Sequence, residues 1–114
     1  MADEATALKI AHGGFNRSFC GKNATRLGCG VYFAANAGYS VKYASLDARG
    51  VQRMFVCRVL VGACALGAKD IPAPPDRADR QHQRFDSTVD DMRQPKIYVT
   101  YHDSQALPEY VISF

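Results

Sequence analysis

The stretch Gly30-Val31-Tyr32-Phe33-Ala34, followed by Ser40 and Tyr43, decides the fold and the chemistry that we expect of this chain. A glycine leads into a run that is mostly β-branched or aromatic, which is typical of a short strand. The next segment, 37–45, predicts a short helix, on which residues three apart share a face. Ser40 and Tyr43 would therefore point the same way. Together with Tyr32 they would offer two aromatic rings and one hydroxyl to a flat ring that carries an amide, such as nicotinamide.

The composition indicates one globular domain spanning residues 1–114, with 47% hydrophobic and 22% charged residues. The net charge is +3, but the basic residues are scattered rather than gathered in a stripe, so nucleic acid is not an expected partner. No apolar run approaches the ~20 residues of a membrane span, and MADEATALKI is not a signal peptide. We therefore expect no membrane association and a nuclear or cytoplasmic location.

The four cysteines are Cys20, Cys29, Cys57 and Cys64. None forms a C-x-x-C pair, and no histidine lies at zinc-ligand spacing from them, so no metal is expected. Cys57 lies in an apolar run, and we predict that it packs as a small hydrophobic side chain.

Strand patterns dominate the C-terminal half of the chain. The nearly continuous apolar run 54–61 predicts a central strand that is buried on both faces. Residues 62–84 include three prolines and predict a long surface loop. The runs 97–101 and 110–114 predict two further strands. With few helices available for parallel crossovers, the fold class is α+β, with a mostly antiparallel sheet and short peripheral helices.

Five motifs in this order give the chain a resemblance to a known family. They are residues 14–24, residues 30–34 with Ser40 and Tyr43, residues 85–90, residues 95–101, and residues 103–114 with Gln105, Pro108 and Tyr110. Together they resemble the catalytic domain of the poly(ADP-ribose) polymerase superfamily, the diphtheria-toxin-type ADP-ribosyltransferases, in its mono-ADP-ribosylating, macrodomain-associated branch. The resemblance implies a split-sheet fold of which residues 1–114 form the C-terminal portion, with the N-terminal part missing.

The resemblance also implies a site for NAD as co-substrate, with no metal. Tyr32 matches the tyrosine that stacks on nicotinamide, Ser40 the serine that binds its carboxamide, and Tyr43 the second stacking ring. Residues 14–23 resemble the loop that closes over the donor, with Arg17 as a contact to its phosphate or adenosine end.

Ile97 matches the position of the catalytic glutamate in the polymerising members. Alternation along the strand would send Ile97, Val99 and Tyr101 to one face. Isoleucine cannot act as a general base, so the resemblance implies transfer of a single ADP-ribose to a protein side chain, without a polymer. Glu109 imitates the family glutamate, but the register makes it a solvated loop carboxylate.

The histidine of the family site has no clear match. His12-Gly13 lies only twenty residues before Tyr32, closer than the family's His-Gly pair, and we interpret His12 as the end of a helix, where a cation is favoured. The missing pair leaves an alternative open, in which the chain is a catalytically inactive fragment or pseudo-enzyme that acts as an interaction module. In a third interpretation the tyrosines are only core residues.

Overall fold

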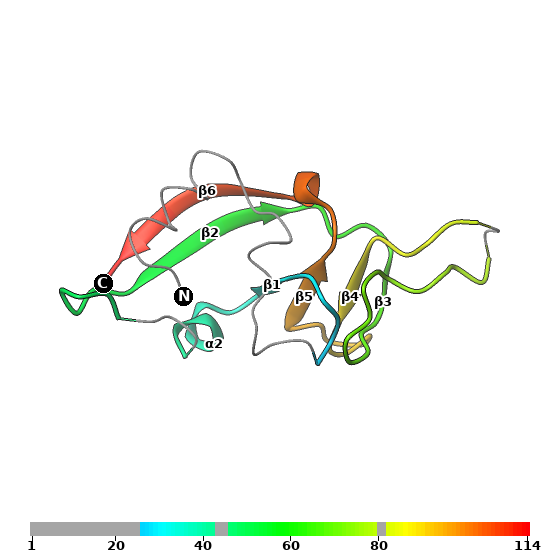
Figure 1. Ribbon diagram of the computed structural model, residues 1–114, viewed down its shortest axis with the longest axis horizontal. Helices are drawn as coiled ribbons and strands as arrows, with labels where there is room; N and C mark the ends of the chain where they lie inside the picture. Colours follow the sequence, from blue (N-terminus) through cyan, green and yellow to red (C-terminus); the bar gives the residue numbers. More distant parts are fainter. Residues whose placement is uncertain (1–25, 43–45, 80–81) are drawn as a thin grey trace.

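The computed structural model describes residues 26–42, 46–79 and 82–114, and within them strands outnumber helices (Figure 1). The elements, in chain order, are β1 (Val31–Ala34), α2 (Ala37–Val41), β2 (Arg53–Val59), β3 (Cys64–Leu66), β4 (Ser87–Val89), β5 (Ile97–Thr100), the 3₁₀ turn η2 (Asp103–Gln105) and β6 (Ala106–Ser113).

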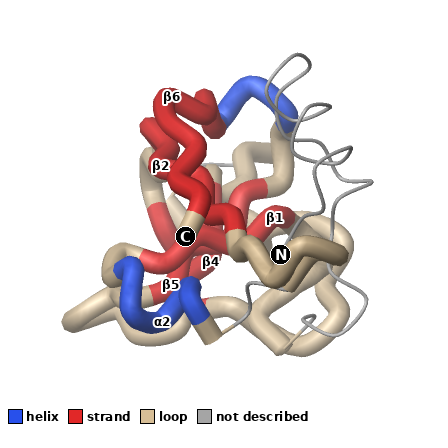
Figure 2. Tube along the Cα trace, turned by 90° about the vertical axis from the view of Figure 1, so that its left-hand side faces the viewer, coloured by secondary structure: helices blue, strands red, loops and turns tan. Residues whose placement is uncertain are grey.

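The strands form two sheets. A four-stranded sheet has the order β1-β5-β4-β3, and β2 pairs with β6 in a two-stranded sheet. All pairings are antiparallel except β3 with β4, which are parallel. Figure 2 shows β2 and β6 side by side, apart from the strands of the larger sheet. The predicted α+β class with a mostly antiparallel split sheet is confirmed.

Two predictions about strands were wrong. The run 54–61 is not a central strand, because β2 pairs with β6 and with no other strand of the described residues, and Val56 is 43% exposed. Residues 62–84 are not loop throughout, because Cys64–Leu66 pairs with β4. Of the described residues that follow, 76–79 and 82–84 extend away from both sheets, and Asp76 and Arg84 form an isolated antiparallel bridge there (Figure 1).

The two faces of β1 contact different apolar clusters. Val31 and Phe33 pack with residues of the two-stranded sheet, namely Phe55, Cys57, Val59 and Ala106. Tyr32 points the other way and packs against a cluster on β5. Cys57 is thus a small hydrophobic side chain between the sheets, as predicted, and burial raises the pKa of its thiol to about 11.

The Gln105 side chain joins the two sheets where β5 ends and β6 begins. Its Oε1 accepts hydrogen bonds from the backbone N–H groups of Tyr101 and His102, each at 3.0 Å. Its amide nitrogen donates to three oxygens at the ends of β2 and β4, which are Leu60 O (3.1 Å), Asp86 O (2.9 Å) and Ser87 Oγ (3.1 Å). Gln105 is buried, so one side chain satisfies polar groups from three strand ends away from water.

The turn that leads into β2 is organised by Asp47. Its Oδ1 accepts from the N–H groups of Arg49 (2.8 Å) and Val51 (2.9 Å), and its Oδ2 accepts from Arg53 Nη1 at 2.8 Å. The Val51 N–H and the Arg53 guanidinium lower the pKa of Asp47 to about 2.

We predict that Gln105→Leu destabilises the fold by about 3 kcal/mol or more, because buried backbone groups that lose their partner cost roughly 1–3 kcal/mol each. Urea unfolding followed by circular dichroism measures the change. Ser104→Ala, on the exposed side of the same turn, is the control and should stay close to wild type. A Gln105→Leu protein as stable as the control would contradict the junction described above.

We predict that Asp47→Asn costs stability at pH 7 but little at pH 2. The folded-state pKa of Asp47 lies below its unfolded value, so its contribution is present above pH ~4 and is lost as the pH falls through about 2. The urea midpoints of wild type and variant, compared at both pH values, test this. A gap between the midpoints that is equally wide at pH 2 would be evidence against it.

Candidate functional site

Tyr32 lies in the middle of β1, and its hydroxyl is held by the turn that precedes the strand. The hydroxyl donates to Gly28 O (2.8 Å) and accepts from the Leu27 N–H (2.9 Å). The phenol group is therefore a structural anchor. What Tyr32 can offer to a bound molecule is the face of its ring.

The Tyr32 ring packs against a set of side chains that we call the aromatic cluster. Its buried members are Leu27, Ile97, Val99 and Tyr101, and Tyr32 and Tyr39 pack against them. The predicted alternation along β5 is confirmed, because Ile97, Val99 and Tyr101 share this face. Ile97 is 6% exposed and its strand pairs with β1, so the strand of Tyr32 and the side chain of Ile97 meet in one place.

Two buried hydroxyl groups contact the turn before β1. The Tyr101 and Thr88 hydroxyls lie 2.8 Å apart, and Thr88 Oγ1 donates to Leu27 O at 3.0 Å. Gly28 has a φ of +129°, and a Cβ at this position would overlap the Tyr101 hydroxyl. Tyr101 is thus a core residue, and the turn that anchors Tyr32 requires glycine.

Helix α2 packs against β1 and carries Ser40. Asn36 caps the helix, because its Oδ1 accepts from the Gly38 N–H at 2.7 Å. Ser40 is half-buried, and Tyr39 packs against the aromatic cluster. Sequence reasoning missed Tyr39.

Two residues of the sequence-based site, Tyr43 and Arg17, lie outside the described residues, and so does His12, which we interpret as a helix end. Tyr43, Arg17 and His12 are among residues 1–25 and 43–45, and their predicted roles stay predictions. The structure brings together Tyr32, Ile97 and the helix of Ser40.

Glu109 lies in the other sheet, on β6. It is exposed, as predicted, but it belongs to a strand rather than a loop, and its Oε1 pairs with Arg58 Nε at 2.9 Å. The strand continues through Pro108 because the pairing with β2 has an irregularity between Val56 and Cys57. Its position on β6 excludes Glu109 from the aromatic cluster.

The aromatic cluster combines tyrosine rings with the aliphatic side chains of Leu27, Ile97 and Val99. None of its members carries a carboxylate. Across residues 26–42, 46–79 and 82–114, no group of three or more His, Cys, Asp or Glu side chains is placed to hold a metal ion. No helix in this part of the chain is long and apolar enough to cross a membrane.

We predict that Tyr32→Phe lowers the free energy of unfolding by about 1–3 kcal/mol, because the Leu27 N–H and Gly28 O lose their partner. Tyr110→Phe is the matched control, since Tyr110 is 67% exposed. Urea unfolding measures both. If the two variants lose the same stability, the hydroxyl of Tyr32 does not anchor the turn.

Comparisons with known proteins agree with this arrangement. The family model of the poly(ADP-ribose) polymerase catalytic domain matches residues 3–84. Protein mono-ADP-ribosyltransferase PARP10 from Mus musculus is 46% identical over 112 residues, which are 96% of this chain and 12% of that protein. Protein mono-ADP-ribosyltransferase PARP14 from Homo sapiens is 36% identical over 115 residues, which are 98% of this chain and 6% of that protein. The chain thus spans a small part of the length of these relatives.

A solved structure gives the same answer for the fold. The PARP domain of Arabidopsis RADICAL-INDUCED CELL DEATH1 superposes with a TM-score of 0.65 at 26% identity, over 81% of this chain and 52% of that domain. The aromatic cluster beside β1 therefore lies in a PARP-domain fold. The chain belongs to the poly(ADP-ribose) polymerase catalytic domain family.

Proposed function

We propose that this chain supplies the nicotinamide-binding side of a mono-ADP-ribosyltransferase that uses NAD⁺ to modify protein side chains. The observation that carries the proposal is the meeting of the Tyr32 strand and the Ile97 side chain at the aromatic cluster. An aromatic face suits the leaving group, and an aliphatic residue at the place of the glutamate is compatible with transfer of a single ADP-ribose. The names of the two relatives support the same activity.

The nicotinamide end of NAD⁺ would be held by three residues. The Tyr32 ring supplies a stacking face, for which a pair of aromatic rings contributes ~0.5–1.5 kcal/mol beyond area burial. The Ser40 hydroxyl would bond the carboxamide, and Tyr43 would supply the second face. Arg17 would contact the phosphate or adenosine end. Holding the leaving group in this way lowers the barrier by positioning it for departure.

The reaction breaks the bond between the ribose C1 and the nicotinamide nitrogen, and the bonding electrons leave with nicotinamide. A carboxylate of the acceptor protein then forms the new bond to C1 with its own lone pair. No proton has to be removed from such an acceptor, so an isoleucine at position 97 does not prevent the step. A sugar hydroxyl would need a general base, which is why a second ADP-ribose is not added.

The partners of this activity would be NAD⁺ and proteins with acidic side chains, in the nucleus, the cytoplasm or both. Scattered basic residues support neither nucleic-acid binding nor attachment to membranes by this part of the chain.

Incubation of the full-length protein with labelled NAD⁺ tests the proposal. We expect release of nicotinamide and attachment of single ADP-ribose units, and Ser40→Ala should reduce the rate about tenfold, the effect of losing roughly 1.4 kcal/mol of transition-state stabilisation. Ser104→Ala, exposed on η2, is the control. Absence of both label and free nicotinamide would instead favour a catalytically silent interaction module.

We predict that Ile97→Glu does not produce a polymer. Position 97 is buried among apolar side chains, and burial raises the pKa of a carboxyl group and keeps it neutral. Gel analysis of chain length measures the product, and Ile97→Leu is the volume-matched control. Chains of two or more ADP-ribose units from the Ile97→Glu protein would show that position 97 alone limits elongation.

A further inference from the structure

Asp90, the residue after β4, forms hydrogen bonds with Lys96 and Ile97 and so joins the two ends of the connection between β4 and β5. The Asp90 N–H donates to Ile97 O at 3.3 Å. In the other direction, Asp90 Oδ1 accepts from the N–H groups of Ile97 (3.1 Å) and Lys96 (2.9 Å). The side chain of Asp90 therefore fixes the first residue of β5 from the β4 side.

The start of β5 is also bound on its other side, by the end of β1 and the residue that follows it. The Ala35 N–H donates to Lys96 O at 2.9 Å, and Ala34 is the register partner of Ile97. The peptide between Lys96 and Ile97 is thus bound at its oxygen by Ala35, the residue after β1, and at its N–H by Asp90. This peptide sets where the Ile97 side chain enters the aromatic cluster.

The Asp90 carboxylate binds backbone N–H groups at the start of β5 and not a cationic side chain of the described residues. Within the described residues it forms no ion pair. Partial burial acts to raise the pKa of Asp90, but the backbone N–H groups of Lys96, Ile97, Asp90 and Asp91 together outweigh it, and the pKa lies below the usual value. The half-buried carboxylate is therefore charged when it accepts these bonds, which strengthens them.

We propose that Asp90 is a positioning residue, whose carboxylate holds the start of β5 so that Ile97 forms a fixed wall beside Tyr32. This inference rests on the proposed function. An acceptor that approaches the ribose would meet this wall, and small displacements of reacting groups reduce turnover strongly. Asp90 would then affect the rate of transfer, while the stacking that binds NAD⁺ stays in place.

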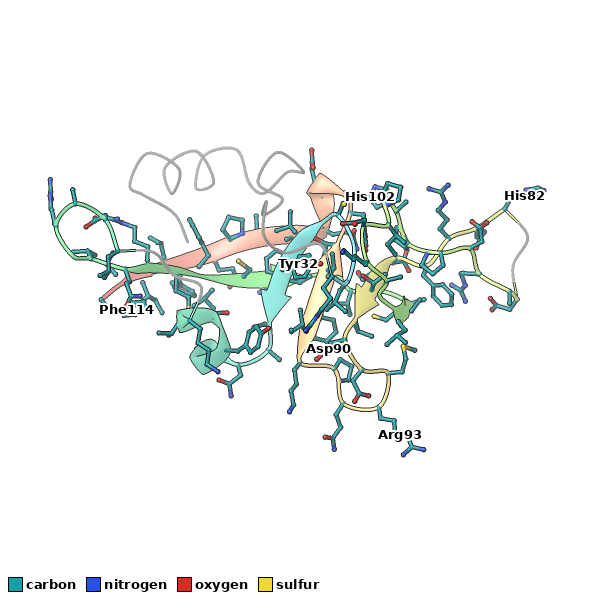
Figure 3. The ribbon with its side chains drawn as sticks, turned by 60° about the horizontal axis from the view of Figure 1, so that its bottom comes forward. Tyr32, His82, Asp90, Arg93, His102 and Phe114 are labelled. Atoms are coloured by element: carbon teal, nitrogen blue, oxygen red, sulfur yellow. The ribbon has the colours of Figure 1, made fainter. Side chains whose placement is uncertain are left out.

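The neighbouring residue offers a matched control. Asp91 Oδ1 accepts from the N–H groups of Arg93 (2.8 Å) and Gln94 (3.3 Å), so its bonds stay inside the loop and do not reach β5. Figure 3 shows Asp90 at the base of this loop and Arg93 at its far end. Removal of either carboxylate loosens the loop, but only removal of Asp90 frees the start of β5.

The experiment compares Asp90→Ala, Asp90→Asn and Asp91→Ala in the full-length protein, with kcat and KM for NAD⁺ as the readout. We expect Asp90→Ala to lower kcat about tenfold and to change KM less than twofold. Asp90→Asn should restore most of kcat, because its amide oxygen accepts the same two bonds, and Asp91→Ala should match wild type. Equal losses in Asp90→Ala and Asp91→Ala, or an unchanged kcat in Asp90→Ala, would overturn the proposal.

Amide hydrogen exchange separates this proposal from the proposed function. Asp90→Ala should speed exchange at Lys96 and Ile97 at least tenfold, while Val99, in the middle of β5, keeps its protection. If wild type transfers no ADP-ribose but exchange changes in this way, the proposed function fails and the positioning by Asp90 stands. Unchanged exchange at Ile97 would refute the positioning whatever the activity.

Discussion

The structure depends on the buried amide of Gln105. Five polar groups at the ends of β2, β4 and β5 meet in a place from which water is largely excluded, and this single side chain supplies both the acceptor and the donors that they need. A glutamate could not donate and an asparagine would be one carbon shorter, so glutamine is the side chain that fits. Since β6 starts at the next residue, the same contact fixes where the second sheet departs from the first.

Folding and recognition use different parts of the same tyrosine. The Tyr32 hydroxyl is occupied by the Leu27–Gly28 turn, whereas its ring packs against the aromatic cluster. A tyrosine is suited to this division because one end of it is polar and its faces are apolar. The hydroxyl therefore orients the ring before any ligand arrives, and binding would not have to spend free energy on ordering it.

The sequence allowed β1 and β5 to be predicted, because both are short runs of β-branched and aromatic residues, and alternation correctly placed Ile97 with Val99 and Tyr101. It did not predict the exposure of β2, because an apolar run says nothing about how many strands lie beside it. Cys64–Leu66 was missed for a similar reason: three residues in a proline-rich segment become a strand only through pairing with distant β4.

The candidate site was predictable to the same degree. The three-residue spacing of Ser40 and Tyr43 after Tyr32 indicated it, and the resemblance to the family supplied Ile97. The structure brings Tyr32, Ile97 and the helix of Ser40 together, and the role of Tyr43 stays a prediction. The partners of the Tyr32 hydroxyl and the role of Asp90 were not predictable, because each is a contact between a side chain and a backbone group whose position only the folded chain defines.

The two unlike faces of β1 have a consequence for the uniqueness of the fold. Val31 and Phe33 fill the space between the sheets and Tyr32 fills the opposite side, so a shift of the strand by one residue would place a phenol hydroxyl in an apolar layer without its two partners. The sequence of β1 thus disfavours a one-residue shift of its pairing with β5. A chain in which both faces of β1 were alike would have two alignments of similar free energy, and it would fold to a mixture of two structures.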